Sequence, residues 1–99
     1  ELIFQGTIID AGKALEIGLI NEIADDPLEA ALNLAERISF KPPLALKAAK
    51  QCIAMTAKSD LRTGLEYEEV VWSSLYATKD QKEGMKSFTE KRKPVFTGE

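Results

Sequence analysis

The sequence has no histidine and only one cysteine, and these two shortages narrow the chemistry open to the chain. Without histidine, Cys52 has no imidazole partner for nucleophilic catalysis, and any metal site would have to consist of carboxylates alone. No group of Asp and Glu has calcium-loop spacing, and the six glycines are too scattered to form a phosphate-binding loop. We therefore predict no catalytic residue and no metal site. A lone cysteine also forms no internal disulfide, which indicates a reducing compartment.

Long apolar runs and an excess of positive charge are also missing. No apolar run approaches the ~20 residues that span a bilayer, so we expect no membrane segment. The net charge is -3, and the one basic cluster lacks interleaved aromatic residues, which argues against a nucleic-acid partner. The 99 residues, 44% hydrophobic and 29% charged, are typical of one small globular domain.

The first 23 residues predict two short helices, each ended by a glycine. The first helix stops at Gly6 but has no capping residue or earlier turn before it, so we expect the chain to be the C-terminal piece of a longer protein. Asp10 is placed to cap a second helix over residues 11–17, which Gly18 ends. Residues 19–23 are partly β-branched and predict one short extended segment or strand without partners.

Four amphipathic helices are predicted after this segment, from caps and from apolar residues that repeat every three or four positions: residues 27–38, 44–57, 61–77 and 79–92. Asp26 and Pro27 form a strong helix start, and the pair Pro42-Pro43 separates two helices. Thr78 has the position of a helix cap, with Gln81 three residues later. We predict an all-α fold of five to six short helices with one short extended segment.

The helix over residues 61–77 has an apolar stripe interrupted by an acid. Leu61, Leu65 and Trp72 belong to this stripe, and Glu68 lies within it. Glu68 either lies at the edge of the stripe or is buried against a positive or amide partner, possibly from another subunit. Apolar faces of this kind need covering, so the pattern also predicts self-association.

The C-terminus concentrates the positive charge of an acidic chain. Residues 86–99 carry four Lys or Arg and two Glu, whereas residues 1–85 carry nine Lys or Arg and fourteen Asp or Glu. Phe88 and Lys91 are three residues apart, so one helical face would present an aromatic ring beside a charge. Such a face suits a nucleotide-bearing ligand. The alternative is that these cations only offset the negative end of the helix dipole.

A series of short motifs resembles the C-terminal half of the crotonase superfamily, closest to the enoyl-CoA hydratases. The motifs occur in this order: Glu1-Leu-Ile-Phe-x-Gly6, Ile9-Asp-Ala11, Gly18-Leu-Ile-Asn-Glu22, Lys41-Pro-Pro-Leu-Ala-Leu-Lys47, Gly64-Leu-x-x-Glu68, Asp80-x-Lys-Glu-Gly-Met85 and Phe88-x-Glu-Lys-Arg-x-Pro-x-Phe96. The resemblance covers the whole chain. Each motif alone is moderately specific, and their joint order is highly specific.

The resemblance implies a helical trimerisation region that lacks the family's N-terminal spiral of ββα units. It implies that residues 1–23 are a remnant linking to the missing spiral and that residues 24–99 are a helical oligomerisation region. The oxyanion-hole amides and the two catalytic glutamates of the family then lie outside this chain. Phe88 and Lys91 match positions from which the family's last helix reaches the CoA adenine and phosphates of a neighbouring subunit.

The expected function is the C-terminal part of an enoyl-CoA hydratase, a carbon–oxygen lyase of fatty acid metabolism, that is inactive alone and contributes to subunit assembly and part of the CoA site. The expected partners are acyl-CoA or CoA and further copies of the chain, and no cofactor is bound tightly. The alternatives are the tail of an isomerase, dehalogenase or ring-forming synthase of the same superfamily, or a free-standing helical oligomerisation module. The expected location is the cytoplasm, or the mitochondrial matrix in a eukaryote.

Overall fold

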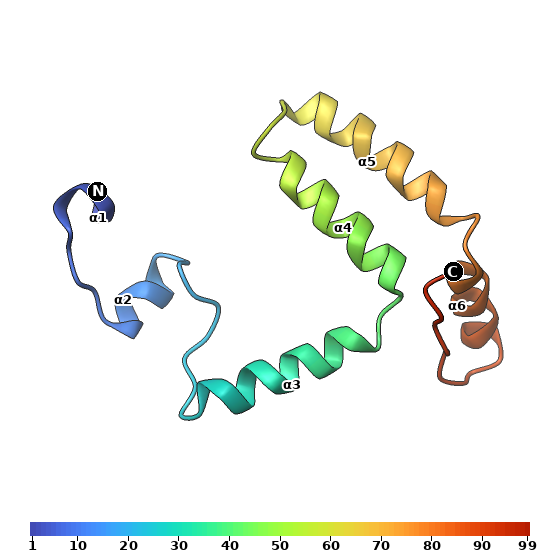
Figure 1. Cartoon of the computed structure of the whole chain (residues 1–99), viewed down its shortest axis with the longest axis horizontal. Coiled ribbons are helices and arrows are strands. Elements are labelled where there is room, and N and C mark those ends of the chain that lie inside the picture. Colours follow the sequence, from blue (N-terminus) through green and yellow to red (C-terminus); the bar gives the residue numbers. More distant parts are fainter. The chain divides into compact units, whose positions relative to one another are not determined.

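The computed structural model describes residues 1–99 and contains six α-helices and no β-strand (Figure 1). The helices are α1 (Leu2–Gln5), α2 (Ala11–Glu16), α3 (Pro27–Ser39), α4 (Pro43–Met55), α5 (Leu61–Leu75) and α6 (Lys79–Thr89). The prediction of an all-α chain with five to six helices is confirmed. None of these helices is both long enough and apolar enough to cross a membrane.

The chain divides into two compact units, Glu1–Ala35 and Glu36–Glu99, and the boundary falls inside α3. The predicted division at residues 23/24 concerns the origin of the two segments and stays a prediction. In the first unit the glycine stops lie where the sequence places them. Gly6 and Gly18 both have left-handed φ angles, 63° and 73°, which a glycine adopts without steric cost.

Residues 19–23 form no strand in the first unit. The amide of Leu19 donates to the carbonyl of Ala14 at 2.9 Å, so the segment begins by closing the C-terminal end of α2. The predicted cap of α2 is confirmed, because the Asp10 carboxylate accepts from the Lys13 amide at 2.8 Å. Residues 19–23 are therefore an irregular connection, because their β-branched side chains have no partner strand to pair with.

The three helices of the second unit end two or three residues earlier than predicted. Near two of these ends a threonine hydroxyl donates a hydrogen bond to a carbonyl of the last helical turn: Thr56 Oγ1 to the carbonyl of Ile53, and Thr78 Oγ1 to that of Leu75. Helix α6 ends at Thr89 instead of residue 92, because Lys91 adopts a left-handed conformation with φ 52°. These helix ends are set by hydroxyl side chains that bond to helix carbonyls and by the backbone angle of Lys91. The apolar repeat in the sequence predicts neither of these features.

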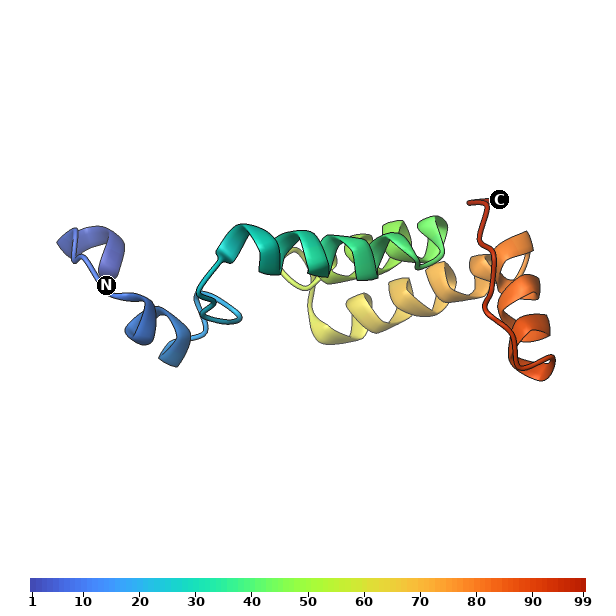
Figure 2. The same ribbon diagram turned by 90° about the horizontal axis from the view of Figure 1, so that it is seen from below.

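Helices α4 and α5 run antiparallel and pack side by side (Figures 1 and 2). Helix α4 has a strip of small residues that is only partly covered: Ala48 is buried, and Ala45 and Cys52 are half-buried. Cys52 is therefore only partly covered. A chain of this length provides too little covering surface around α4.

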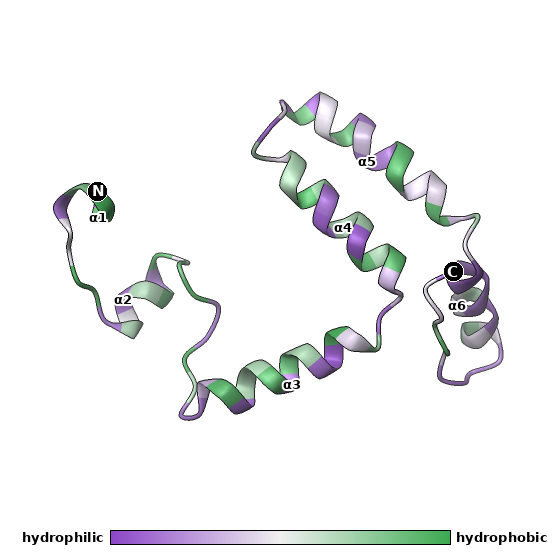
Figure 3. Ribbon diagram, in the orientation of Figure 1, coloured by the Kyte–Doolittle hydropathy of each residue, from purple (hydrophilic) through white to green (hydrophobic).

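The apolar stripes of α3 and α5 remain largely uncovered. Figure 3 shows hydrophobic and hydrophilic residues alternating along α3, α4 and α5. Leu28 of α3 is 69% exposed, and Leu61 and Trp72 of α5 are 80% and 61% exposed. Glu68 is also exposed and forms no ion pair, which agrees with a position at the edge of the stripe. Most of the large apolar residues therefore face solvent.

Candidate functional site

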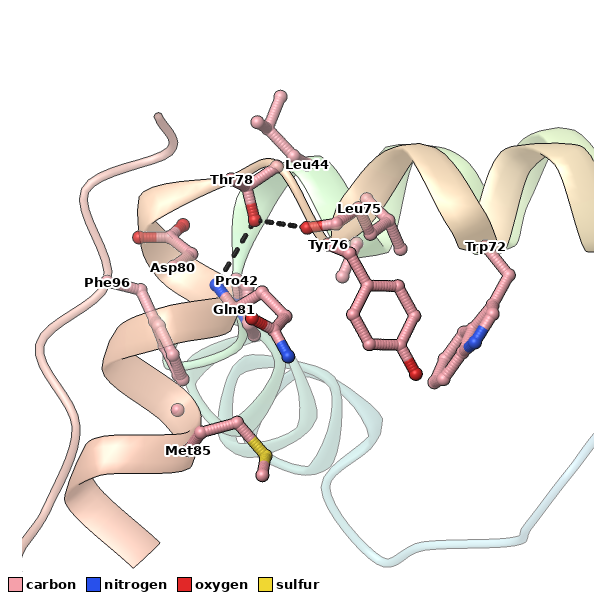
Figure 4. Close-up of a pocket in the computed structure, with 12 residues that line it drawn as sticks. Pro42, Leu44, Trp72, Leu75, Tyr76, Thr78, Asp80, Gln81, Met85 and Phe96 are labelled. Carbon is pink, nitrogen blue, oxygen red and sulfur yellow. Dashed lines mark hydrogen bonds between the residues drawn. The ribbon is translucent and has the colours of Figure 1, made fainter.

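An apolar pocket with a volume of about 380 Å³ lies in the second unit, where α4 begins, α5 ends and α6 passes the C-terminal segment (Figure 4). Its lining residues come from these four parts of the chain: Pro42, Leu44, Ala45, Trp72, Leu75, Tyr76, Thr78, Asp80, Gln81, Gly84, Met85 and Phe96. The volume is within the range of small-molecule sites, and the lining is mostly aliphatic and aromatic. The pocket is suited to an apolar group.

Two aromatic side chains at the C-terminal end of α5, one in its last turn and one at its C-cap, line the pocket together. The Trp72 and Tyr76 rings are 5.9 Å apart between centroids and nearly perpendicular, with an interplanar angle of 81°. This edge-to-face arrangement places the positive edge of one ring against the negative face of the other. Figure 4 shows Phe96 reaching toward α6 from the C-terminal segment, so aromatic rings come from two parts of the chain.

Asp80 is the most deeply buried residue of the chain, with 2% exposure. Its Oδ1 accepts from the Thr97 amide at 2.7 Å, and its Oδ2 accepts from the Gly98 amide at 2.9 Å. Both carboxylate oxygens therefore have backbone donors, as a buried carboxylate requires. This arrangement holds the C-terminal segment and engages both carboxylate oxygens with backbone donors.

Glu83 lies one turn after Asp80 and binds Arg92 through both oxygens. The two nitrogen–oxygen distances are 2.5 and 2.8 Å, and the Val95 amide adds a third hydrogen bond of 3.0 Å to Glu83 Oε1. The Arg92 hydrogen bonds, followed by that of Val95, lower the pKa of Glu83 from 4.5 to about 2. The hydrogen bonds of Arg92 to Glu83, followed by that to Glu90, raise the pKa of Arg92. Glu83 therefore stays ionised near neutral pH and has no proton to donate.

Phe88 and Lys91, the two predicted CoA-contacting residues, both lie outside the lining of the pocket. Phe88 is in the last turn of α6 and is 82% exposed. The expectation that both share one helical face is wrong, because α6 ends at Thr89 and Lys91 is left-handed. The Lys91 amide still donates to the Phe88 carbonyl at 3.2 Å, which keeps their backbones adjacent.

The cations at the C-terminus differ in what they contact. Arg92 pairs with Glu83 and Glu90, and Lys86 lies 3.9 Å from Glu90. Lys91 and Lys93 form no ion pair. Of the positive patch seen in the sequence, these two lysines are the charges still available to an anionic ligand.

The structure also brings together residues that sequence reasoning did not select. Asp80 and Glu83 bind the segment that carries Phe96, because that segment returns along α6, although Asp80 and its partners are 17 and 18 positions apart. These residues belong to two of the family motifs, but the motifs alone do not give them a role, and two acids three residues apart on a helix are usually solvated. No group of three or more His, Cys, Asp or Glu residues is arranged to hold a metal ion.

Comparison with known proteins gives one consistent family. A family model described as enoyl-CoA hydratase/isomerase matches residues 1–99. The chain is 43% identical over 100 residues to a probable mitochondrial enoyl-CoA hydratase 2 of Arabidopsis thaliana, covering 99% of this chain and 33% of the relative. It is 37% identical over 100 residues to 2,3-dehydroadipyl-CoA hydratase of Escherichia coli, covering 99% of this chain and 39% of the relative.

Solved structures agree with these sequence relatives. The crystal structure of an enoyl-CoA hydratase from Bacillus anthracis matches with a TM-score of 0.86 and 38% identity, covering 92% of this chain and 36% of that protein. The match is to a helical part of the crotonase fold, as the motif order predicted. The chain thus spans between 33% and 39% of the length of these three proteins.

Proposed function

Because this chain belongs to the enoyl-CoA hydratase/isomerase family, we propose that it is the C-terminal helical region of an enzyme that adds water to 2-enoyl-CoA or removes it from 3-hydroxyacyl-CoA. The observation that carries this proposal is the match of all 99 residues to the family, together with relatives named as hydratases. An isomerase, a dehalogenase or a ring-forming synthase is the alternative within the superfamily. A reducing location, the cytoplasm or the mitochondrial matrix, suits the lone free cysteine.

The first proposed role is subunit assembly. The exposed apolar residues of α3 and α5, among them Leu28, Leu32 and Leu61, form faces that water does not favour. Association between copies of the chain, of the trimer type, would cover such faces. Light scattering over a concentration series tests this role, and a clean monomer at high micromolar concentration would contradict it.

The second proposed role is contact with the nucleotide part of CoA through Phe88 and Lys91. Phe88 offers an exposed ring on which an adenine can stack, and Lys91 offers an ammonium group that has no carboxylate partner. CoA itself carries several negative phosphate charges, which an unpaired lysine attracts. The site is partial, because two side chains on one chain enclose little of a ligand of that size.

A calorimetric titration with CoA tests this second role. Lys91→Ala removes the proposed phosphate contact, and Lys82→Ala is the matched control, since Lys82 is also exposed and without an ion pair. We expect weaker CoA binding for Lys91→Ala and unchanged binding for Lys82→Ala. Equal affinities for the two variants would leave Lys91 as a residue that only offsets the helix dipole.

The proposed enzyme's chemistry is assigned to residues outside this chain. Addition of water to a double bond needs a positioned acid–base pair and hydrogen-bond donors for the thioester oxygen. The best-placed carboxylates here, Asp80 and Glu83, are fully engaged with the C-terminal segment and Arg92. A free-standing helical oligomerisation module is the second candidate function, and the same exposed faces favour it.

A further inference from the structure

The last six residues, 94–99, run back along α6 (Figures 1 and 2), and their backbone groups form hydrogen bonds with side chains and amides of that helix. The Val95 amide donates to Glu83, and the Thr97 and Gly98 amides donate to Asp80. The carbonyl of Glu99 then accepts from two amides in the first turn of α6, Lys79 at 2.7 Å and Asp80 at 3.2 Å. The segment is therefore attached at three successive places along one helix.

The burial of Asp80 depends on this segment. All the side-chain hydrogen bonds of Asp80 go to the amides of Thr97 and Gly98, and it forms no ion pair. A carboxylate that is 2% exposed needs such donors, because an unpaired buried charge is costly. When the segment leaves α6, the carboxylate loses both its donors and its cover at once. In the closed arrangement the two amides therefore compensate the carboxylate for its burial, and in the open arrangement water replaces them.

Phe96 lies between these attachment points and reaches the pocket. Its ring passes close to α6 at Gly84: a Cβ atom placed on that glycine would be 3.8 Å from Phe96 Cε1. The pocket lining includes Phe96 and no other residue of the C-terminal segment. The position of Phe96 as a wall of the pocket therefore depends on attachment of the C-terminal segment to α6.

We infer that residues 94–99 are a strap, that Asp80 and Glu83 clamp it to α6 at two separate points, and that its closure places Phe96 as a removable wall of the apolar pocket. Beyond the two clamps, the strap is held at Glu99, whose carbonyl accepts from the Lys79 and Asp80 amides and whose carboxylate pairs with Lys79. Its apolar contacts are few, since Phe96 and Gly98 are half-buried and its other four residues are exposed. Segments held by few apolar contacts open at lower free energy than the elements that they cover. Opening of the strap widens the pocket without unfolding α6.

Site-resolved amide exchange of the 99-residue chain, followed by NMR, tests the two clamps separately. Asp80→Asn keeps the shape of the side chain but leaves a single acceptor oxygen, so we expect exchange at Thr97 and Gly98 to accelerate about tenfold or more. Val95, held by Glu83, keeps its protection in this variant. Glu83→Gln gives the reverse pattern, and Glu69→Gln, an exposed residue of α5, is the control that changes neither.

The position of Phe96 gives a second readout. A nuclear Overhauser contact between the Phe96 ring and the α-protons of Gly84 is expected in the unaltered chain and in Glu69→Gln, and it is expected to weaken in Asp80→Asn. Persistence of this contact with unprotected Thr97 and Gly98 amides would overturn the assignment of Phe96 as a removable wall.

A third variant keeps the proposal testable if Asp80→Asn fails to fold. Deletion of residues 96–99 should expose the Lys79 and Asp80 amides to exchange, because both donate to Glu99, while the Gln81 amide stays protected by Thr78 Oγ1. Two results would overturn the strap: Thr97 and Gly98 amides that exchange at unprotected rates in the unaltered chain, or loss of protection throughout α6 in the deletion variant.

Discussion

Replacing Lys91 with glycine is expected to stabilise the second unit. Lys91 follows the last turn of α6 and is the one residue other than glycine with a positive φ angle. The Arg92 amide donates to the Ser87 carbonyl at 3.0 Å and the Lys91 amide to the Phe88 carbonyl at 3.2 Å. These two bonds form a Schellman motif, in which the residue at the position of Lys91 is usually glycine.

The size of the effect follows from two opposing contributions. A side chain with a Cβ atom in the left-handed region costs roughly 1–2 kcal/mol, which the glycine removes. Glycine also gives the unfolded chain more freedom, which lowers the free energy of unfolding by about 0.4–1 kcal/mol. The net expectation for Lys91→Gly is a free energy of unfolding higher by about 0.5–1 kcal/mol.

Urea unfolding followed by circular dichroism measures this change, with Lys91→Ala and Lys82→Gly as controls. Lys91→Ala keeps the Cβ atom and should leave the midpoint nearly unchanged. Lys82→Gly puts the same glycine inside α6 and should destabilise by about 1 kcal/mol. A destabilised Lys91→Gly would refute the assignment of strain to this residue. Both Lys91 variants should weaken CoA binding alike, so stability and ligand contact are separable at one position.

Three further outcomes test other contacts of the second unit. Arg92 lowers the pKa of Glu83 to about 2, so the stability that ionised Glu83 contributes is fully present above about pH 4.5 and is lost as the pH falls from there toward 2. Unfolding curves measured across that pH range should show this loss, and Glu83→Gln should abolish this pH dependence. Gly98→Ala should destabilise by about 1 kcal/mol, since φ is +80° and a Cβ atom is strained in that region, although it would make only an ordinary contact of 3.5 Å with Pro43 Cγ; a neutral thermal melt would contradict this. Thr78→Ala should cost about 1 kcal/mol through loss of the α6 cap, with Thr78→Ser as the variant that retains stability.

Much of the local structure could be predicted because its causes are local. The side chains of Asp10 and Thr78 each cap a helix by accepting from an amide three residues later in the sequence. Gly6 and Gly18 end helices because glycine adopts the left-handed conformation without steric cost. The end of α6 was missed because lysine is ordinary in a last helical turn and gives no sign of a left-handed angle. A glycine at that position would have marked the boundary.

The candidate site was less predictable, because its contacts are not local. Asp80 has the sequence position of an acid that favours a helix start, and only the returning tail turns it into a buried acceptor for Thr97 and Gly98. The hydrophobic pattern predicted apolar faces on α3 and α5 that need partners, and Leu28, Leu61 and Trp72 are indeed exposed. The family resemblance supplied Phe88 and Lys91, and their CoA contact stays a prediction.

Incubation of crotonyl-CoA with the sequence-verified 99-residue chain tests most directly the claim that this region binds and assembles while the chemistry lies elsewhere. The account predicts that crotonyl-CoA is recovered unchanged at every protein concentration. Formation of 3-hydroxybutyryl-CoA at a rate that rises with the concentration of the chain would contradict it, because no carboxylate pair described above is free to move a proton and a water molecule.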